Sequence, residues 1–113
     1  MKKVICIGNP VLHVLIKCLN HKGYDVLISR SYHDAAALLG KEGVVAVIIE
    51  RDTVYGRDRA AGQAKELQKI IPTILFTTAD TAKGVKYVVS TSWPNRLNRI
   101  LHYLQEIEKE SVR

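Results

Sequence analysis

Short apolar runs alternate with segments of helical spacing along this chain. Five of the runs are rich in β-branched residues and cover positions 4–7, 26–28, 44–49, 73–76 and 87–89. Continuous apolar runs of this length are typical of parallel strands that are covered on both faces. The segments between and after the runs place apolar residues at helical spacing. We therefore expect an α/β fold, a doubly wound five-stranded parallel sheet with helices on both faces.

Helix-capping residues mark where several of these helices begin. Ser31 with Asp34 forms a capping-box pattern in front of an apolar helical segment. Asp58 is placed to cap the next helix, and Ser92, followed by Pro94, is placed to cap the last one. These positions predict three helix starts.

The composition is that of one globular domain. The chain has 113 residues, of which 47% are hydrophobic and 25% charged, enough to bury one core. We expect a single domain over 1–113, without a signal peptide or membrane span, and a cytoplasmic location. Cys6 and Cys18 lack metal-ligand or disulfide spacing, and the histidines are scattered. We expect no metal and no cofactor.

Four segments, in order, resemble the receiver domain of bacterial response regulators. They are GYDV at 23–26, S-x-x-D-A-x-x-L-L at 31–39, VVAVIIE at 44–50 and IPTILFTTA at 71–79. The resemblance implies a flavodoxin-like (CheY-like) strand order 2-1-3-4-5. It also implies a role in two-component signal transduction, with the site at the carboxyl ends of the strands.

The resemblance also implies which positions carry the chemistry, and most of them have changed. The acidic pair that holds magnesium in receivers maps onto Gly8 and Asn9, and the phosphate-accepting aspartate maps onto Glu50. Thr77 is retained, whereas the lysine position falls at or near Ser90. Phosphoryl transfer between anions needs a divalent cation and a fixed positive side chain. We therefore expect a degenerate pseudo-receiver that is not phosphorylated and is not an enzyme.

Glu50 has two interpretations. In the first, its longer side chain holds a negative charge farther out, toward Thr77, and imitates a phosphorylated state. In the second, it is a solvated residue at the rim of the sheet or pairs with Arg51 or Arg30, because surface ion pairs are common and weak. We favour the second interpretation.

Arginines follow the second, third and fifth predicted strands. At that edge of the sheet helix amino ends already carry partial positive charge, so the helix dipole disfavours them. A planar guanidinium suits bidentate contacts with carboxylate or phosphate, which makes this rim a candidate site for an anionic partner. The alternative is a solvated rim partly neutralised by aspartates. The residues are Arg30, Arg51, Arg57, Arg59, Arg96 and Arg99.

The net charge of +6 raises the question of nucleic acid, but no nucleic-acid-binding motif is present and the aromatics are not interleaved with the arginines. We therefore consider nucleic acid unlikely and expect a different signalling protein as the partner. The alternative function is a sensor that binds a nucleotide or other phosphorylated anion at the arginine rim.

The connection between the fourth and fifth strands is short. Positions 79–86 number eight, whereas a parallel crossover with its helix takes about a dozen residues or more. We expect that helix to be absent or one turn long. Ile74, Phe76 or Val88 would then face water, unless residues 81–85 fold back over the sheet or another subunit covers it. We predict a homodimer through this side, with Trp93 or Tyr103 near its centre.

Overall fold

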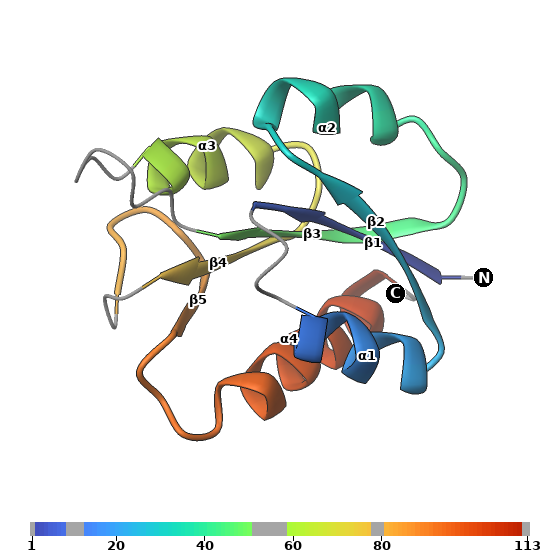
Figure 1. Ribbon diagram of the computed structural model, residues 1–113. Helices are drawn as coiled ribbons and strands as arrows, with labels where there is room; N and C mark the ends of the chain where they lie inside the picture. Colours follow the sequence, from blue (N-terminus) through green and yellow to red (C-terminus); the bar gives the residue numbers. More distant parts are fainter. Residues whose placement is uncertain (1, 9–12, 51–58, 78–80, 112–113) are drawn as a thin grey trace.

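A computed structural model describes residues 2–8, 13–50, 59–77 and 81–111, which form five strands and four helices (Figure 1). The strands are β1 (Lys2–Ile7), β2 (Tyr24–Ser29), β3 (Val44–Glu50), β4 (Thr73–Thr77) and β5 (Tyr87–Ser90). The helices are α1 (His13–His21), α2 (Tyr32–Leu38), α3 (Arg59–Leu67) and α4 (Arg96–Ser111).

All five strands run parallel in the order β2-β1-β3-β4-β5, which confirms the predicted architecture. Helices α1 and α4 cover one face of the sheet, and α2 and α3 cover the other (Figure 1). Parallel pairing brings the carboxyl ends of the strands to one edge. Because β1 lies between β2 and β3, residues that follow β1 lie beside the end of β3.

Alternating side chains of the strands form a separate core on each face. Cys6 and Ile48 belong to the core under α1 and α4, whereas Ile5 and Ile49 belong to the core under α2 and α3. Full burial of one such aliphatic side chain stabilises the fold by about 1.5–3 kcal/mol. Both faces of the sheet are covered, as the unbroken apolar runs predict.

The helix starts agree with the capping prediction in one case and not in another. The Ser31 side chain accepts a hydrogen bond from the Asp34 amide at 3.0 Å, which confirms Ser31 as the cap of α2. The prediction for Ser92 is wrong, because α4 begins only at Arg96. The Ser92 hydroxyl lies 2.8 Å from that of Ser90 instead, and two successive turns precede the helix. Asp58 lies outside the described residues.

Residues 81–86 connect to β5 without a helix, in agreement with the short spacing. The crossover is held by Gln68, directly after α3. The Gln68 amide group donates to the carbonyl of Gly84, and its side-chain oxygen accepts from the Lys86 amide at 3.1 Å. Gly84 has a φ of 81°, which glycine adopts without strain. These two bonds fix the crossover against the end of α3.

The crossover covers the sheet within the single chain. Ala82 and Val85 pack against the core under α2 and α3. Ile74 and Phe76 lie on the opposite face of the sheet, in the core under α1 and α4. All three residues named in the prediction are buried, since Ile74, Phe76 and Val88 have exposed fractions of 0%, 5% and 8%. Of the alternatives in the sequence analysis, the structure shows the one in which the loop folds back. The expected apolar surface is not present on these residues, so the reason given for a homodimer does not hold.

Within the described ranges, no helix combines the length and the apolar character needed to cross a bilayer.

Candidate functional site

The ends of β1 and β3 bring Gly8 and Glu50 into contact. Gly8 has a φ of 141°, and its amide donates to the carbonyl of Ser29 at 3.1 Å. A Cβ placed on Gly8 would lie 2.8 Å from the Cβ of Glu50 and 3.1 Å from its Oε2. The Glu50 side chain thus occupies the space into which a side chain at position 8 would project.

The carboxylate of Glu50 lies near the buried thiol of Cys6. Cys6 pairs in register with Ile48, so Cys6 and Glu50 share the face of the sheet that α1 and α4 cover. Burial, and secondly the Glu50 charge, raise the pKa of Cys6 to about 12. The thiol therefore stays protonated at neutral pH and is no nucleophile.

Thr77 and Ser90 end β4 and β5 and pair with each other in register. Both residues are buried, at 1% and 0% exposure. The Thr77 hydroxyl oxygen has no hydrogen-bond partner among the described residues, so Glu50 does not accept from it. Ser90 bonds to the Ser92 hydroxyl at 2.8 Å and supplies no charge at the position that the resemblance assigns to lysine. The structure places these equivalents at the same strand-end edge without bonding Glu50 to Thr77.

The described arginines do not form one cluster. Arg30 follows β2, whereas Arg96 and Arg99 lie in the first turn of α4, which follows β5. Strands β2 and β5 are the two outermost strands of the sheet, four strand spacings or about 19 Å apart. One small anion cannot contact both groups. Asn9, Arg51 and Arg57 lie outside the described residues, and only the backbone of Arg59, the first residue of α3, is described.

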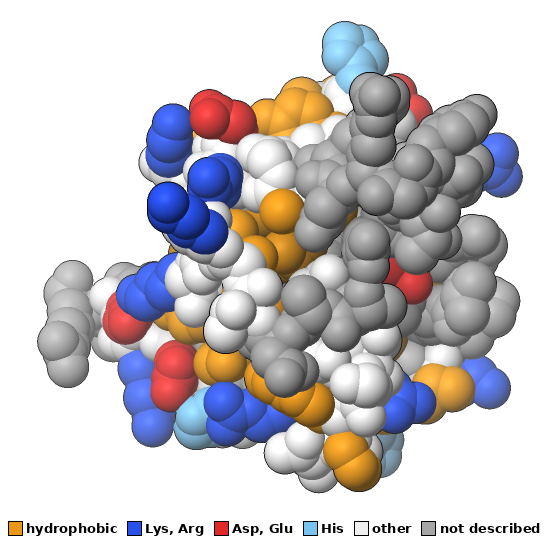
Figure 2. Space-filling view, turned by 90° about the vertical axis from the view of Figure 1, so that its left-hand side faces the viewer, with side chains coloured by type: hydrophobic (Ala, Val, Ile, Leu, Met, Phe, Trp, Pro, Cys, Tyr) orange, Lys and Arg blue, Asp and Glu red, His pale blue; other side chains and the backbone are white. Residues whose placement is uncertain are grey.

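Figure 2 looks onto the edge at which the strands end. Basic side chains lie at the left-hand and lower margins of this view. The face has no described cluster of three or more histidine, cysteine, aspartate or glutamate side chains that would suit a metal ion, nor has the rest of the described chain.

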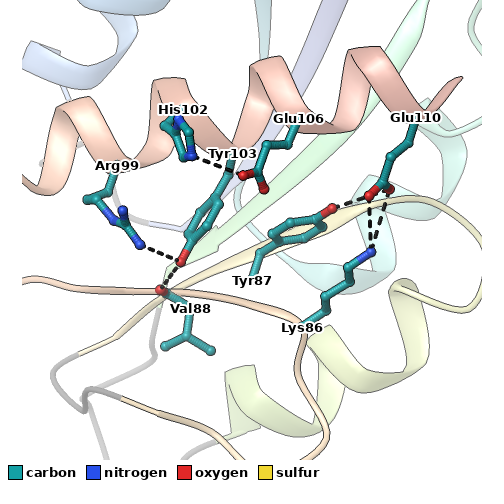
Figure 3. Close-up of polar contacts among 8 residues, drawn as sticks. All are labelled: Lys86, Tyr87, Val88, Arg99, His102, Tyr103, Glu106 and Glu110. Atoms are coloured by element: carbon teal, nitrogen blue, oxygen red, sulfur yellow. Dashed lines mark hydrogen bonds and ion pairs between the residues drawn. The ribbon is translucent and has the colours of Figure 1, made fainter. Parts of the chain in front are cut away.

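Helix α4 lies along β5, the strand at the free edge of the sheet, so the side chain of Tyr103 reaches the backbone of that strand (Figure 3). The Tyr103 hydroxyl donates to the carbonyl of Val88 at 3.5 Å and accepts from Arg99 at 3.3 Å. The Arg99 guanidinium lies over the Tyr103 ring, 5.2 Å from its centroid. The rings of Tyr87 and Tyr103 pack at 5.1 Å with a tilt of 53°, a favourable aromatic geometry.

Charged side chains flank these aromatic rings on α4, and together they form what we call the α4–β5 face: Tyr87, Arg96, Arg99, His102, Tyr103, Glu106 and Glu110. His102 contacts the Glu106 carboxylate at 2.9 Å, and Lys86 contacts that of Glu110 at 3.5 Å. Arg96 and Arg99 lie in the first turn of α4, whereas its last turn holds Glu110 next to Lys109. Trp93, the other residue predicted at an interface, is half-buried against the core under α1 and α4.

Comparison with solved structures identifies this fold. A chemotaxis response regulator, CheY4 of Vibrio cholerae, superposes with a TM-score of 0.69 at 16% sequence identity, over 95% of this chain and 98% of that one. The receiver domain of the Francisella response regulator 1452 gives 0.75 at 14%, over 98% and 99%. The chain has the fold of a response-regulator receiver domain.

A third receiver comes from a larger protein. The signal receiver domain of an HD domain-containing protein from Pseudomonas fluorescens gives a TM-score of 0.74 at 16% identity, over 99% of this chain and 93% of that one. No family model matches the sequence. A search of curated proteins likewise finds no relative. The receiver fold is thus shared across nearly the whole chain.

Proposed function

We propose that this is a degenerate receiver that acts in signal transduction by binding another protein, without being phosphorylated. The contact between Gly8 and Glu50 carries the proposal. Receiver chemistry requires an acidic side chain where Gly8 stands, and Glu50 fills that space. The two substitutions fit each other sterically, so neither is an isolated change.

The electrostatics support the same conclusion. Magnesium requires octahedral oxygen coordination and is held in such sites through carboxylates and substrate phosphate. At the positions of the acidic pair, Gly8 and Asn9 supply no carboxylate. Glu50 is the one carboxylate among the mapped positions, and its charge lies beside the protonated thiol of Cys6. Ser90, buried at the end of β5, adds no cation to offset charge on a transferred phosphoryl group. These positions therefore lack both positive charges that lower the barrier to phosphoryl transfer, the bound magnesium ion and the lysine ammonium group.

The α4–β5 face is the surface that we propose for the partner. Arg96 and Arg99 at the start of α4 would bind an acidic group of the partner, whereas Glu110 near its end already pairs with Lys86. The half-buried ring of Tyr103 adds contact area at little cost in conformational freedom, whereas Tyr87 is buried beneath it. A homodimer through the same side remains a prediction, which sedimentation equilibrium at micromolar concentration tests.

Acetyl phosphate tests the loss of phosphorylation. The chain is incubated with acetyl phosphate and magnesium beside a receiver that retains its acids, and both are weighed intact by mass spectrometry. We expect an adduct on the second protein alone. Glu50→Asp is the matched variant. It restores an acceptor without the acidic pair and should also stay unmodified. A stoichiometric adduct on the parent chain would refute the proposal.

The alternative function, a sensor of phosphorylated anions, is tested by a thermal-shift screen. The separation of Arg30 from Arg96 and Arg99 argues against one site that uses all of these guanidiniums. A saturable rise in melting temperature with a single anion would favour the sensor, because a ligand that binds only the folded state stabilises it.

A further inference from the structure

A pocket of about 520 Å³ opens between the end of α3 and the crossover to β5. It lies at the edge where β4 and β5 begin, opposite the edge that holds Gly8 and Glu50. The lining residues are Gln68, Ile70, Ile71, Pro72, Thr73, Gly84, Val85, Lys86, Tyr87 and Glu110. This volume is in the range of sites that hold a small molecule or a large side chain.

The walls of the pocket combine apolar and polar groups in similar proportion. Ile71 and Val85 contribute from the core under α2 and α3, and Tyr87 and Pro72 contribute from the starts of the strands. Ile70 is 73% exposed, the largest exposed fraction among the large hydrophobic side chains described. An exposed isoleucine beside a partly apolar pocket is costly in water, and covering it by a partner is favourable. The surface is therefore suited to receiving an apolar group.

The rim carries more lysines than acids. Each described acidic residue on the rim already forms an ion pair with a lysine. Glu66 contacts Lys69 at 3.2 Å, and Glu110 contacts Lys86 at 3.5 Å (Figure 3 shows the second pair). Two further lysines flank Gly84. Lys83 precedes it, and the Cε of Lys65 lies where a side chain at position 84 would project. These two ammonium groups give the described rim an excess of positive charge.

The pocket is fixed before anything binds. Gln68 holds Gly84 and Lys86 by its two hydrogen bonds, so the crossover wall does not have to order itself around a ligand. Preorganisation of this kind lowers the entropy that binding costs.

We infer that this pocket docks an acidic segment of a partner protein, with an apolar side chain in the pocket and flanking carboxylates on Lys65 and Lys83. Charge complementarity selects this occupant over a basic or neutral one. The site adjoins the α4–β5 face, with which it shares Tyr87 and Glu110, and it does not depend on whether Glu50 is phosphorylated. It gives the chain a second docking surface, at the opposite end of its strands from the site of receiver chemistry.

Peptide titration followed by NMR tests the inference. The probe is a glutamate-rich peptide of about ten residues with one central leucine, added to the 15N-labelled chain. We expect saturable shifts confined to the amides of Gln68, Ile70, Gly84, Val85 and their neighbours. A second peptide with serine for leucine should bind about tenfold more weakly or worse, because burial of a leucine contributes about 1.5–3 kcal/mol. Equal binding of both peptides, or shifts scattered over the surface, would overturn the inference.

Matched variants separate this site from general charge attraction. Lys65→Glu with Lys83→Glu should weaken binding of the leucine peptide about tenfold. Each substitution replaces an attraction of about 0.2–1 kcal/mol with a repulsion of similar size. Lys17→Glu with Lys22→Glu makes the same change in net charge on exposed residues at α1 and should leave affinity within about twofold. Equal losses in both would overturn the inference. The acetyl phosphate result bears on the proposed function alone, so the two claims fail separately.

An apolar pair of variants makes the same distinction. Ile70→Ser should weaken binding, whereas Val14→Ser, which changes another exposed apolar residue at 62% exposure, should not. Both positions are exposed, so the fold tolerates both changes. A parent-like affinity for Ile70→Ser would show that the apolar rim takes no part and would overturn this docking mode.

Discussion

Gly8 and Glu50 are packed so closely that position 8 has no room for a Cβ, which would lie 2.8 Å from the Cβ of Glu50. Real Cβ atoms essentially never come within 3.0 Å of such a neighbour. The backbone of Gly8 adds a second constraint, because its φ of 141° is strained for any residue with a side chain. Two features therefore require glycine at position 8: the conformation of its own backbone and the contact with Glu50.

Gly8→Ala should therefore destabilise the protein. We expect a loss of about 1–3 kcal/mol in the free energy of unfolding, the range for backbone strain at a special φ. Urea denaturation followed by circular dichroism measures it. Gly62→Ala is the matched control, because a Cβ there meets nothing within 4 Å and alanine stabilises the exposed helical position in α3 by about 0.8–1 kcal/mol.

The double variant separates the two constraints. Glu50→Gly removes the Cβ that a side chain at position 8 would meet, but leaves the backbone strain. Gly8→Ala should therefore cost less in the Glu50→Gly background than in the parent. Glu50→Ala, which keeps the Cβ, should give no such relief. If all three backgrounds give the same loss, the contact with Glu50 contributes nothing to the requirement for glycine.

Gln68→Ala should loosen the crossover. It removes both hydrogen bonds that join the end of α3 to Gly84 and Lys86. We expect a loss of about 1–3 kcal/mol, because each bond contributes about 0.5–1.5 kcal/mol. Amide exchange should become faster at residues 82–86 before other regions change. The control is Gln105→Ala on the exposed side of α4, for which we expect a change within about 0.5 kcal/mol. Unchanged exchange at Lys86 would contradict this role of Gln68.

The strands were predictable because each depends on a local pattern, and their order followed from the resemblance to receiver domains. Val44 to Ile49 is apolar on both faces, and Ser31 with Asp34 bonds within one helical turn. The Gln68 clamp was not predictable, since it joins residues 16 and 18 positions apart without a local motif. The same holds for the docking pocket, whose walls come from segments that only the fold brings together. Of the site, sequence placed Glu50, Thr77 and Ser90 at the strand ends, but not the packing of Glu50 on Gly8.

The stability of the protein should fall as pH rises above 9. Burial and the Glu50 charge raise the pKa of Cys6 from 9.0 to about 12. Burial and the charge of Glu108 raise that of Tyr24 from 10.0 to about 12. A group with a raised pKa contributes stability that is complete below its unfolded value and is lost toward its folded value. The window is therefore pH 9 to 12, and Cys6 alone accounts for up to about 1.4 kcal/mol per pH unit.

Urea denaturation at pH 7, 9, 10 and 11 measures that loss. Cys6→Ala removes one titrating group, so its stability should fall less steeply with pH than that of the parent, although it starts lower because of the cavity. Cys18→Ala, which removes a half-buried thiol from α1, is the matched control. A parent-like slope in Cys6→Ala would assign the effect to other groups.

Tyr103→Phe isolates the hydroxyl that closes the edge of β5. The ring keeps its packing on Tyr87, whereas the contacts with Val88 at 3.5 Å and Arg99 at 3.3 Å are lost. Because both contacts are long, we expect a loss of only about 0.5–1 kcal/mol. The freed carbonyl lies on an edge strand, where an unpaired group can bind another chain, so self-association should also increase in sedimentation at high concentration. Tyr32→Phe is the control, because the described residues offer its hydroxyl no partner. Equal behaviour of the two variants would show that the Tyr103 hydroxyl does not protect this edge.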